Sequence, residues 1–263
     1  MRMILSMLAA GLLALAALAE TRHIAAYRSD LDGGAVHFGD TALESDWPSL
    51  AAWLPMPTQQ GLTSSYASAA MTWTNVGATW ATNGGGSASF NGTSYMAAAT
   101  AFAPGTNDFT ACMWVLWPQL LTNAPGVFGC YRSAASDRWG FYSWTGNYVV
   151  ALLAESTTKR EAKSAPSWIP TTGVWYHVAC AWNRDGNASL YIDGAGVTNV
   201  ALTGTTNAIT PADNTILGAY RNASGAPTSF GYLRIDDPRI YSNTAMTAAA
   251  ISNIYVSGRA AHK

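Results

Sequence analysis

The sequence predicts an all-β protein built as an antiparallel sandwich of two sheets. Short apolar stretches, rich in β-branched and aromatic residues, recur between clusters of Gly, Asn, Ser and Thr. No helical pattern separates these stretches, which argues against alternating strands and helices. The Asp-Gly pairs in 183–187 and 193–196 favour hairpin turns, because glycine tolerates positive φ. The expected strands are 109–117, 140–144, 148–154, 174–182, 189–194, 215–220 and 230–235.

The start of the chain has a different composition. Arg2, an apolar run over 3–18 and Ala-Leu-Ala before Glu20 are the parts of a secretory signal peptide. The run is shorter than a membrane-spanning helix prefers, and the alternative is an uncleaved hydrophobic helix that packs in an assembly. The expected segments are this leader or helix (1–19), a linker or arm (20–46), the sandwich (47–257) and a tail (258–263).

One helix is expected near the end of the chain. The Thr247 side chain can cap it by accepting from an early backbone N–H group. The three alanines that follow, 248–250, are strong helix formers. We expect one to three turns ending near Tyr255, before Gly258.

Charge and cysteine content exclude several classes of function. Only 11% of the residues are charged and the net charge is −1, so nothing favours nucleic acid as a partner. A membrane contact is expected only through residues 1–19, if they are uncleaved. Cys112, Cys130 and Cys180 form no C-x-x-C pair, which argues against a zinc site and allows at most one internal disulfide.

Five segments follow one another in an order that resembles a known family. They read GGSASFNGTSYM, NDFTACMWV, GVWYHVACAWNRDGNASLYIDG, TILGAY and GYLRIDDPRIYSNTAMTAAAISNIY. Together they resemble the laminin-G-like jelly rolls of the concanavalin A-like lectin/glucanase superfamily, over about residues 47–257. The resemblance implies a two-sheet antiparallel jelly roll. It also implies a role in binding glycans or proteins, or as a structural module, with glycosidases among the relatives on this fold. The family also carries a histidine at the position of His177, which we expect to pack in the core or to support neighbouring residues from behind.

The segment YLRIDDPRIY (232–241) carries two adjacent carboxylates in an otherwise strand-like pattern. Ile240 lies five residues after Ile235, so the two share a face only if the strand gains one residue between them. Asp236, Asp237 and a proline fill that gap, and proline is confined to strand edges and bulges. The favoured interpretation is therefore a bulged strand.

The two carboxylates have three candidate roles. In the favoured one, they accept from freed backbone N–H groups or pair with Arg234 or Arg239. A structural Ca²⁺ at Asp236 and Asp237 is the alternative, although hard cations need more oxygens than these two provide. A catalytic pair is the least favoured, because adjacent strand residues point to opposite faces and could not flank one glycosidic bond.

The glutamates give direct evidence against a glycosidase. The glucanase relatives carry E-x-D-x-x-E on one strand, and none of Glu20, Glu44, Glu155 and Glu161 stands in that pattern. Glu155 and Glu161 flank the segment STTKR, which reads as a charged turn. No Ser lies in a nucleophile-elbow context, and no phosphate-binding fingerprint is present. The sequence therefore predicts a protein that is not an enzyme and needs no cofactor.

The stretch 131–150 is the main candidate for a ligand site. It concentrates aromatic rings and planar polar groups, which hold sugars by stacking and by hydrogen bonds. With Phe141 facing the core, Trp139 shares its face, while Tyr142 and Trp144 point the other way. A second candidate loop is 218–230. The candidate ligand-binding residues are Tyr142, Trp144, Tyr148, Arg132, Tyr220 and Arg221.

Three functional hypotheses follow from these observations. The first is a secreted or displayed recognition module that binds a glycan or protein surface through loops of the sandwich. The second is a structural or decoration protein of a viral (phage) or extracellular particle, anchored by residues 1–46 and assembled with copies of itself. The third and weakest is a glycosidase with diverged acids.

Overall fold

The computed structural model describes residues 49–54, 71–82, 86–119, 124–133, 137–144, 148–165 and 168–262. The expected leader or helix and the arm (1–46) lie outside the described residues. Among the described residues, no helix combines the length and the apolar character needed to cross a membrane.

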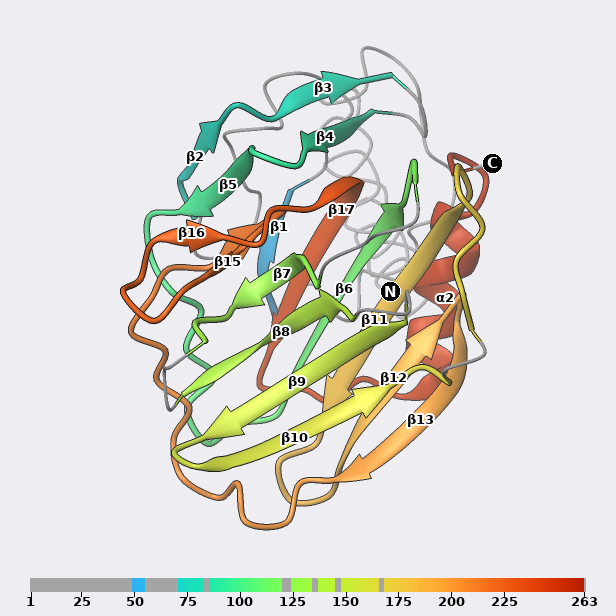
Figure 1. Cartoon of the computed structure of the whole chain (residues 1–263). Coiled ribbons are helices and arrows are strands. Elements are labelled where there is room, and N and C mark those ends of the chain that lie inside the picture. Colours follow the sequence, from blue (N-terminus) through green and yellow to red (C-terminus); the bar gives the residue numbers. More distant parts are fainter. Residues whose placement is uncertain are drawn as a thin grey trace, which may run out of the picture. The chain divides into compact units, whose positions relative to one another are not determined.

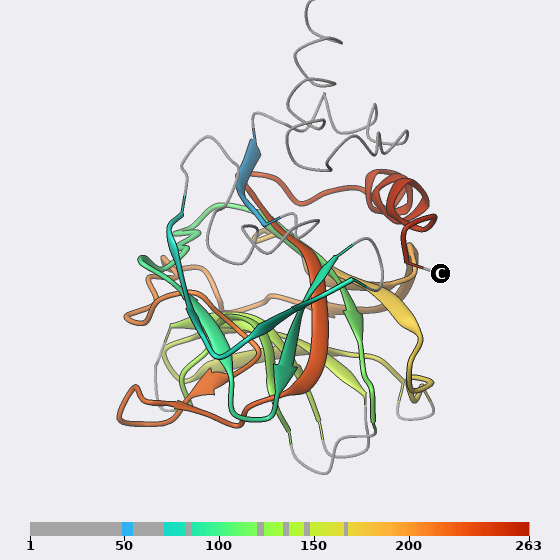
Figure 2. The ribbon, with the colours of Figure 1, turned by 90° about the horizontal axis from the view of Figure 1, so that it is seen from above.

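The fold is the predicted all-β sandwich, made of two antiparallel sheets stacked face to face (Figures 1 and 2). One sheet runs in the order β13-β12-β11-β6-β17-β4-β3, with β1 added beside β17. Its strands are β1 (Leu50–Trp53), β3 (Thr79–Ala81), β4 (Ser87–Asn91), β6 (Phe109–Leu116), β11 (Trp175–Trp182), β12 (Asn187–Ile192), β13 (Ala195–Ala201) and β17 (Tyr232–Ser242). We call it the eight-stranded sheet.

The second, seven-stranded sheet runs in the order β10-β9-β8-β7-β14-β5-β2. Its strands are β2 (Trp73–Val76), β5 (Tyr95–Ala98), β7 (Gly126–Cys130), β8 (Arg138–Ser143), β9 (Val149–Glu155), β10 (Thr158–Lys163) and β14 (Ile216–Leu217). A small ribbon of β15 (Tyr220–Arg221) and β16 (Pro227–Thr228) lies apart from both sheets in the hydrogen-bond pattern.

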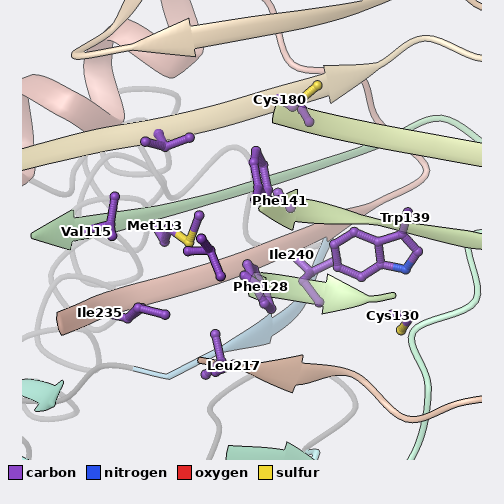
Figure 3. Close-up of a cluster of buried hydrophobic side chains, with 14 of the residues drawn as sticks. Met113, Val115, Phe128, Cys130, Trp139, Phe141, Cys180, Leu217, Ile235 and Ile240 are labelled. Atoms are coloured by element: carbon purple, nitrogen blue, oxygen red, sulfur yellow. The ribbon is translucent and has the colours of Figure 1, made fainter. Parts of the chain in front are cut away.

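The core fills the space between the two sheets. Met113, Val115 and Ile240 point from one sheet toward Phe128 and Phe141 of the other (Figure 3). Aromatic rings pack where β6 begins and β11 ends. There Trp182 stacks on Phe109 with centroids 4.4 Å apart, and Trp139 meets Phe109 edge-on at 5.5 Å. Such tightly packed aromatic burial supplies much of the hydrophobic stabilisation of a sandwich.

The predicted hairpin turn at 183–187 is confirmed between β11 and β12. The Asn183 backbone N–H donates to the Asn187 carbonyl at 3.0 Å, and the Gly186 N–H donates to the Asn183 carbonyl at 3.0 Å. The predicted strand over 215–220, by contrast, is interrupted. Gly218 has a φ of +78°, and a Cβ there would lie 2.3 Å from the Phe90 ring, so β14 ends and the chain turns before β15.

The predicted C-terminal helix is α2 (Ala248–Gly258). Thr247 caps it as expected, accepting from the Ala250 backbone N–H at 3.2 Å. The helix continues past Tyr255 to Gly258, which corrects the expected end. A Cβ at Gly258 would lie 2.6 Å from the Trp114 indole nitrogen, so this glycine serves close packing of the last turn on the sheet.

Candidate functional site on the seven-stranded sheet

The outer face of the seven-stranded sheet carries a cluster of its own, separate from the core. Trp139 and Phe141 of β8 face the core, while Tyr142 points outward, as the alternation of the sequence predicts. On that outer face Tyr142 packs with Val150, Leu152 and Ala154 of β9. Tyr131 and Tyr148 lie half-buried against the same cluster.

Four of the outer rings form a continuous series, which we call the aromatic row: Tyr220, Tyr131, Tyr142 and Trp144. Neighbouring ring centroids lie 4.9 Å apart for Tyr220 and Tyr131, 5.6 Å for Tyr131 and Tyr142, and 5.7 Å for Tyr142 and Trp144. Trp144 is 40% exposed, whereas Tyr142 is only 4% exposed. The row therefore offers Trp144 as its open ring and keeps Tyr142 as a support.

The turn at Gly218, between β14 and β15, brings the two candidate loops together at this row. The Arg221 backbone N–H donates to the Tyr131 carbonyl at 2.9 Å, and the Ser133 N–H donates to the Arg221 carbonyl at 2.9 Å. These bonds hold Tyr220 beside Tyr131. Loops 131–150 and 218–230, predicted as separate candidates, thus contribute to one surface.

The two candidate arginines hold the neighbouring turn. Arg132 donates from Nη2 to the Ala223 carbonyl at 2.8 Å and pairs with Asp213 at 3.4 Å. Arg221 donates from Nη1 to the Gly225 carbonyl at 3.0 Å. Both guanidinium groups therefore already have carbonyl partners, and in this structure they position the turn.

Glu161 is the electrostatic centre of this face. Its carboxylate accepts from Lys159 at 2.7 Å, from Lys163 at 2.8 Å and from the hydroxyl of Tyr142. Burial alone would raise the pKa of Glu161, but these three donors outweigh it and lower the pKa to about 2. Lys163 also lies over the ring of Trp144, with Nζ 5.9 Å from the centroid.

The structure thus distributes the six candidate residues over different environments. Tyr142, Trp144, Tyr148 and Tyr220 lie on or beside the aromatic row, while Arg132 and Arg221 hold the turn next to it. Sequence reasoning missed the role of Glu161 and its two lysines, because the segment STTKR (156–160) reads as a charged turn. The edge strand β10 already begins at Thr158, and the alternation of Lys159, Glu161 and Lys163 is the signal that could have revealed a shared face.

The two glutamates in the described part of the chain lie on opposite faces of the seven-stranded sheet. Glu161 pairs across the ladder with outward-facing Leu152, whereas Glu155 lies three residues further along β9 and points the other way. Glu155 accepts from the Asn207 side chain and forms an ion pair with Arg184 at 3.7 Å. They do not converge on a common cleft.

The bulge predicted in β17 is confirmed. The register with β6 shifts between Asp236 and Arg239, and Asp237 has a φ of +55°. Asp237 pairs with Arg239, as expected, and also accepts from the indole N–H of Trp53. Asp236 is buried and faces the imidazole of His262 at 2.9 Å.

The bulge alters one step of the sequence argument. Strict alternation predicts that the two carboxylates point to opposite faces, but both reach partners on the outer side of the eight-stranded sheet, because the extra residue resets the alternation. Calcium binding at Asp236 and Asp237 would have to displace the basic side chains that they contact, His262 and Arg239. Within the residues that the structure describes, no group of three or more Asp, Glu, His or Cys side chains is arranged to hold a metal ion.

His177 and the three cysteines are buried, but His177 does not lie in the core between the sheets: its ring packs on the outer side of the eight-stranded sheet, beside Trp114 of β6 and Tyr255 of α2. His177 is 1% exposed, with its ring 5.3 Å from that of Trp114, and burial lowers its pKa to about 3. All three cysteines are free thiols rather than half of a disulfide. Burial raises the pKa of Cys112 and Cys130 to about 12, so neither is a reactive thiolate near neutral pH.

Comparison with solved structures finds the same fold in binding domains of toxins. The binding domain of botulinum neurotoxin serotype G is 15% identical with a TM-score of 0.61, and covers 78% of this chain and 50% of that one. The binding domain of Paraclostridial Mosquitocidal Protein 1 is 13% identical with a TM-score of 0.64, over 79% and 52%. The serotype D binding domain is 12% identical with a TM-score of 0.65, over 81% and 53%. The chain therefore spans about half the length of these neighbours.

Sequence comparison identifies the family. No curated protein matches the chain. Residues 90–252, however, match the family described as the concanavalin A-like lectin/glucanases superfamily. That range runs from the end of β4 into α2 and includes every residue of the aromatic row. Because the match spans more than half of the chain, the protein belongs to the concanavalin A-like lectin/glucanase superfamily.

Proposed function

We propose that the protein is a non-catalytic recognition module that binds glycans through the aromatic row on the seven-stranded sheet. The observation that carries this proposal is the continuity of the row from Tyr220 to Trp144, with one ring left open to solvent. A glycan-binding module of this kind acts outside the cell or on its surface, consistent with the leader expected at residues 1–19.

The chemistry of the row suits a sugar. The C–H face of a pyranose packs on an aromatic plane, and its hydroxyl groups need donors and acceptors at the edge of that plane. Trp144 supplies the plane, and the ammonium group of Lys163 lies over it. Lys159 and Lys163 share a single carboxylate, so this end of the row carries an excess of positive charge. A saccharide with an acidic substituent therefore fits this end better than a neutral one.

Two neighbours with the same fold support a glycan as the ligand class. One is the binding domain of botulinum neurotoxin DC in complex with SialylT. Another is described by the dependence of cell entry of botulinum neurotoxin type C on two ganglioside molecules. Both are 12% identical to this chain, so they support the class of ligand and do not transfer a site.

The arrangement of the acids supports binding without catalysis. Glycoside hydrolysis by the usual route needs two carboxyl groups on either side of one glycosidic bond. Glu155 and Glu161 lie on opposite faces of their sheet, and each is held by its own set of donors. We therefore expect the wild-type chain to hydrolyse no glycoside, and Glu155→Gln and Glu161→Gln to behave as the wild type does in the same assay.

The decisive experiment is a glycan array probed with the full chain, followed by calorimetry on the best ligand. We expect Trp144→Ala to weaken binding by roughly tenfold to a hundredfold, on the scale of one aromatic stacking contact of about 1–3 kcal/mol. Trp144→Phe should recover part of the loss. The matched control is Tyr232→Ala, which removes an aromatic side chain with similar exposure (41%) from the eight-stranded sheet.

The outcomes separate the hypotheses. An array with no signal for the wild-type chain, or binding that Trp144→Ala and Tyr232→Ala reduce equally, would reject the aromatic row as a glycan site. The alternative, a structural protein of a particle, rests on residues 1–46, which lie outside the described residues. Assembly of the full chain into particles, without glycan binding, would favour that alternative.

A further inference from the structure

The outer face of the eight-stranded sheet holds a second polar cluster, around His262. This residue follows α2, and its side chain is only 4% exposed. Its imidazole stacks on the indole of Trp114, with centroids 4.1 Å apart and planes 3° from parallel. Trp175 meets the imidazole edge-on at 5.1 Å and 79°. Figures 1 and 2 show α2 on this side of the sandwich.

Both ring nitrogens of His262 face oxygen atoms. Nδ1 lies 2.8 Å from the Gly258 carbonyl, which can only accept, so Nδ1 must carry a proton. Nε2 lies 2.9 Å from Oδ2 of Asp236. If Nε2 lacked a proton, its lone pair would face an ionised carboxylate in a buried site, which is repulsive. One further proton is therefore held between Nε2 and Oδ2.

We propose that Trp114, Trp175 and Asp236 form a socket for an imidazolium, which His262 fills, and that this proton-linked contact fastens the segment after α2 to the sandwich. The flat face of Trp114 attracts a cation through its ring quadrupole, and Asp236 supplies the counter-charge. The socket therefore selects a planar cation, in contrast to the open aromatic row on the other sheet.

The neighbouring ionisable groups do not compete for this role. On β17, Asp237 and Arg239 pair with each other. On β11, burial keeps His177 neutral, and its backbone N–H donates to Asp193 at 2.9 Å. At the end of α2, the guanidinium of Arg259 lies over the Tyr255 ring.

The pH dependence follows from the shared proton. Burial raises the pKa of Asp236 to about 6 against the opposing effect of His262, so the docked carboxyl group holds a proton to higher pH than a free aspartate does. This contribution to stability is fully present below the ordinary aspartate pKa of 3.8 and is lost as the pH rises through about 6, so that part of it remains at about pH 6 and none at about pH 8.5. The contact between His262 and the socket should therefore be more stable at about pH 6 than at about pH 8.5.

The test is cavity rescue in the full chain. His262→Ala should lower Tm at pH 6 by roughly 5 °C or more, because it leaves Asp236 buried without its partner. Free imidazole should then restore part of the loss, and more at pH 6 than at pH 8.5. Wild type, whose socket is filled, should gain nothing from imidazole. The double variant His262→Ala/Asp236→Asn should not be rescued, because the counter-charge is gone.

Three results would overturn the proposal. They are an unchanged Tm for His262→Ala at pH 6, equal rescue by benzene and by imidazole, and equal rescue of the single and double variants. If the alanine variant does not fold, the change in the Tm of the wild type between pH 6 and pH 8.5 replaces it. Asp236→Asn should reduce this change, and an equal change in both proteins would refute the socket.

Discussion

Replacing Glu161 by Gln tests whether the outer face of the seven-stranded sheet is electrostatically organised. The substitution removes the charge and retains an oxygen that can accept from Tyr142. The shift in the Glu161 pKa from 4.5 to about 2 corresponds to an upper limit of about 3.4 kcal/mol, at about 1.36 kcal/mol per pKa unit. Lys159 and Lys163 are 45% and 44% exposed, so solvent screens part of this interaction. We expect a loss of about 1–2 kcal/mol at pH 7.

The pH profile of this loss is the sharper part of the prediction. Because the pKa of Glu161 is lower in the folded state than in the unfolded chain, its contribution is fully present above pH 4.5 and is lost as the pH falls toward 2. Urea unfolding should therefore show the difference between wild type and Glu161→Gln shrinking by more than half at about pH 3. Asp185→Asn, an exposed change of equal charge in the β11–β12 turn, is the control. A difference independent of pH, or a more stable variant at pH 7, would refute the reasoning.

Three further predictions concern the scaffold. Arg184→Met should lower the free energy of unfolding by about 3–5 kcal/mol in urea titrations, because it leaves the buried Glu155 carboxylate without its cationic partner and three carbonyl oxygens without their donor. Thr247→Ala should cost about 1 kcal/mol through the lost cap of α2, seen as faster amide exchange in its first turn. The thiols of Cys112, Cys130 and Cys180 should resist a thiol reagent in the folded protein and react together on unfolding, and fast labelling of the folded protein would contradict their burial.

The sequence was sufficient for the sandwich and for the direction of its side chains, because both follow from a period of two. Trp139 and Phe141 face the core, and Tyr142 faces outward, as alternation required. The bulge in β17 was also predictable, since the five-residue spacing of Ile235 and Ile240 demands one extra residue. These features depend on local pattern alone.

The composition of the site was harder to predict, because it depends on contacts between distant segments. Tyr220 reaches Tyr131 after the chain turns at Gly218, where the ring of Phe90 on the other sheet leaves no room for a Cβ. Tyr142 was expected to be a contact residue, yet its hydroxyl is held by Glu161. Burial depends on which neighbours cover a side chain, and residue type alone does not determine it.

The partner of Asp236 shows the same limit. The sequence placed a carboxylate on a bulged strand, but the cation that faces it, His262, lies 26 residues later and beyond α2. Nothing in the spacing of the two residues indicates their contact. Only the docking of α2 on the eight-stranded sheet brings the imidazole onto Trp114.

The two outer faces of the sandwich thus differ in what covers their side chains, and this difference can be tested. On the eight-stranded sheet, Trp114 and Asp236 are covered by α2 and His262, so this part of the outer face is closed. On the seven-stranded sheet, the apolar side chains of β9 are covered by large rings of the same face, and Trp144 remains open. Substitutions on separate faces with no shared partners should act additively. His262→Ala should therefore lower Tm without changing glycan affinity. Trp144→Ala should weaken glycan binding and leave the pH dependence of Tm unaltered. If the effects of the two substitutions on Tm or on affinity were not additive in the double variant, the two faces would be coupled through the core, which would contradict this expectation.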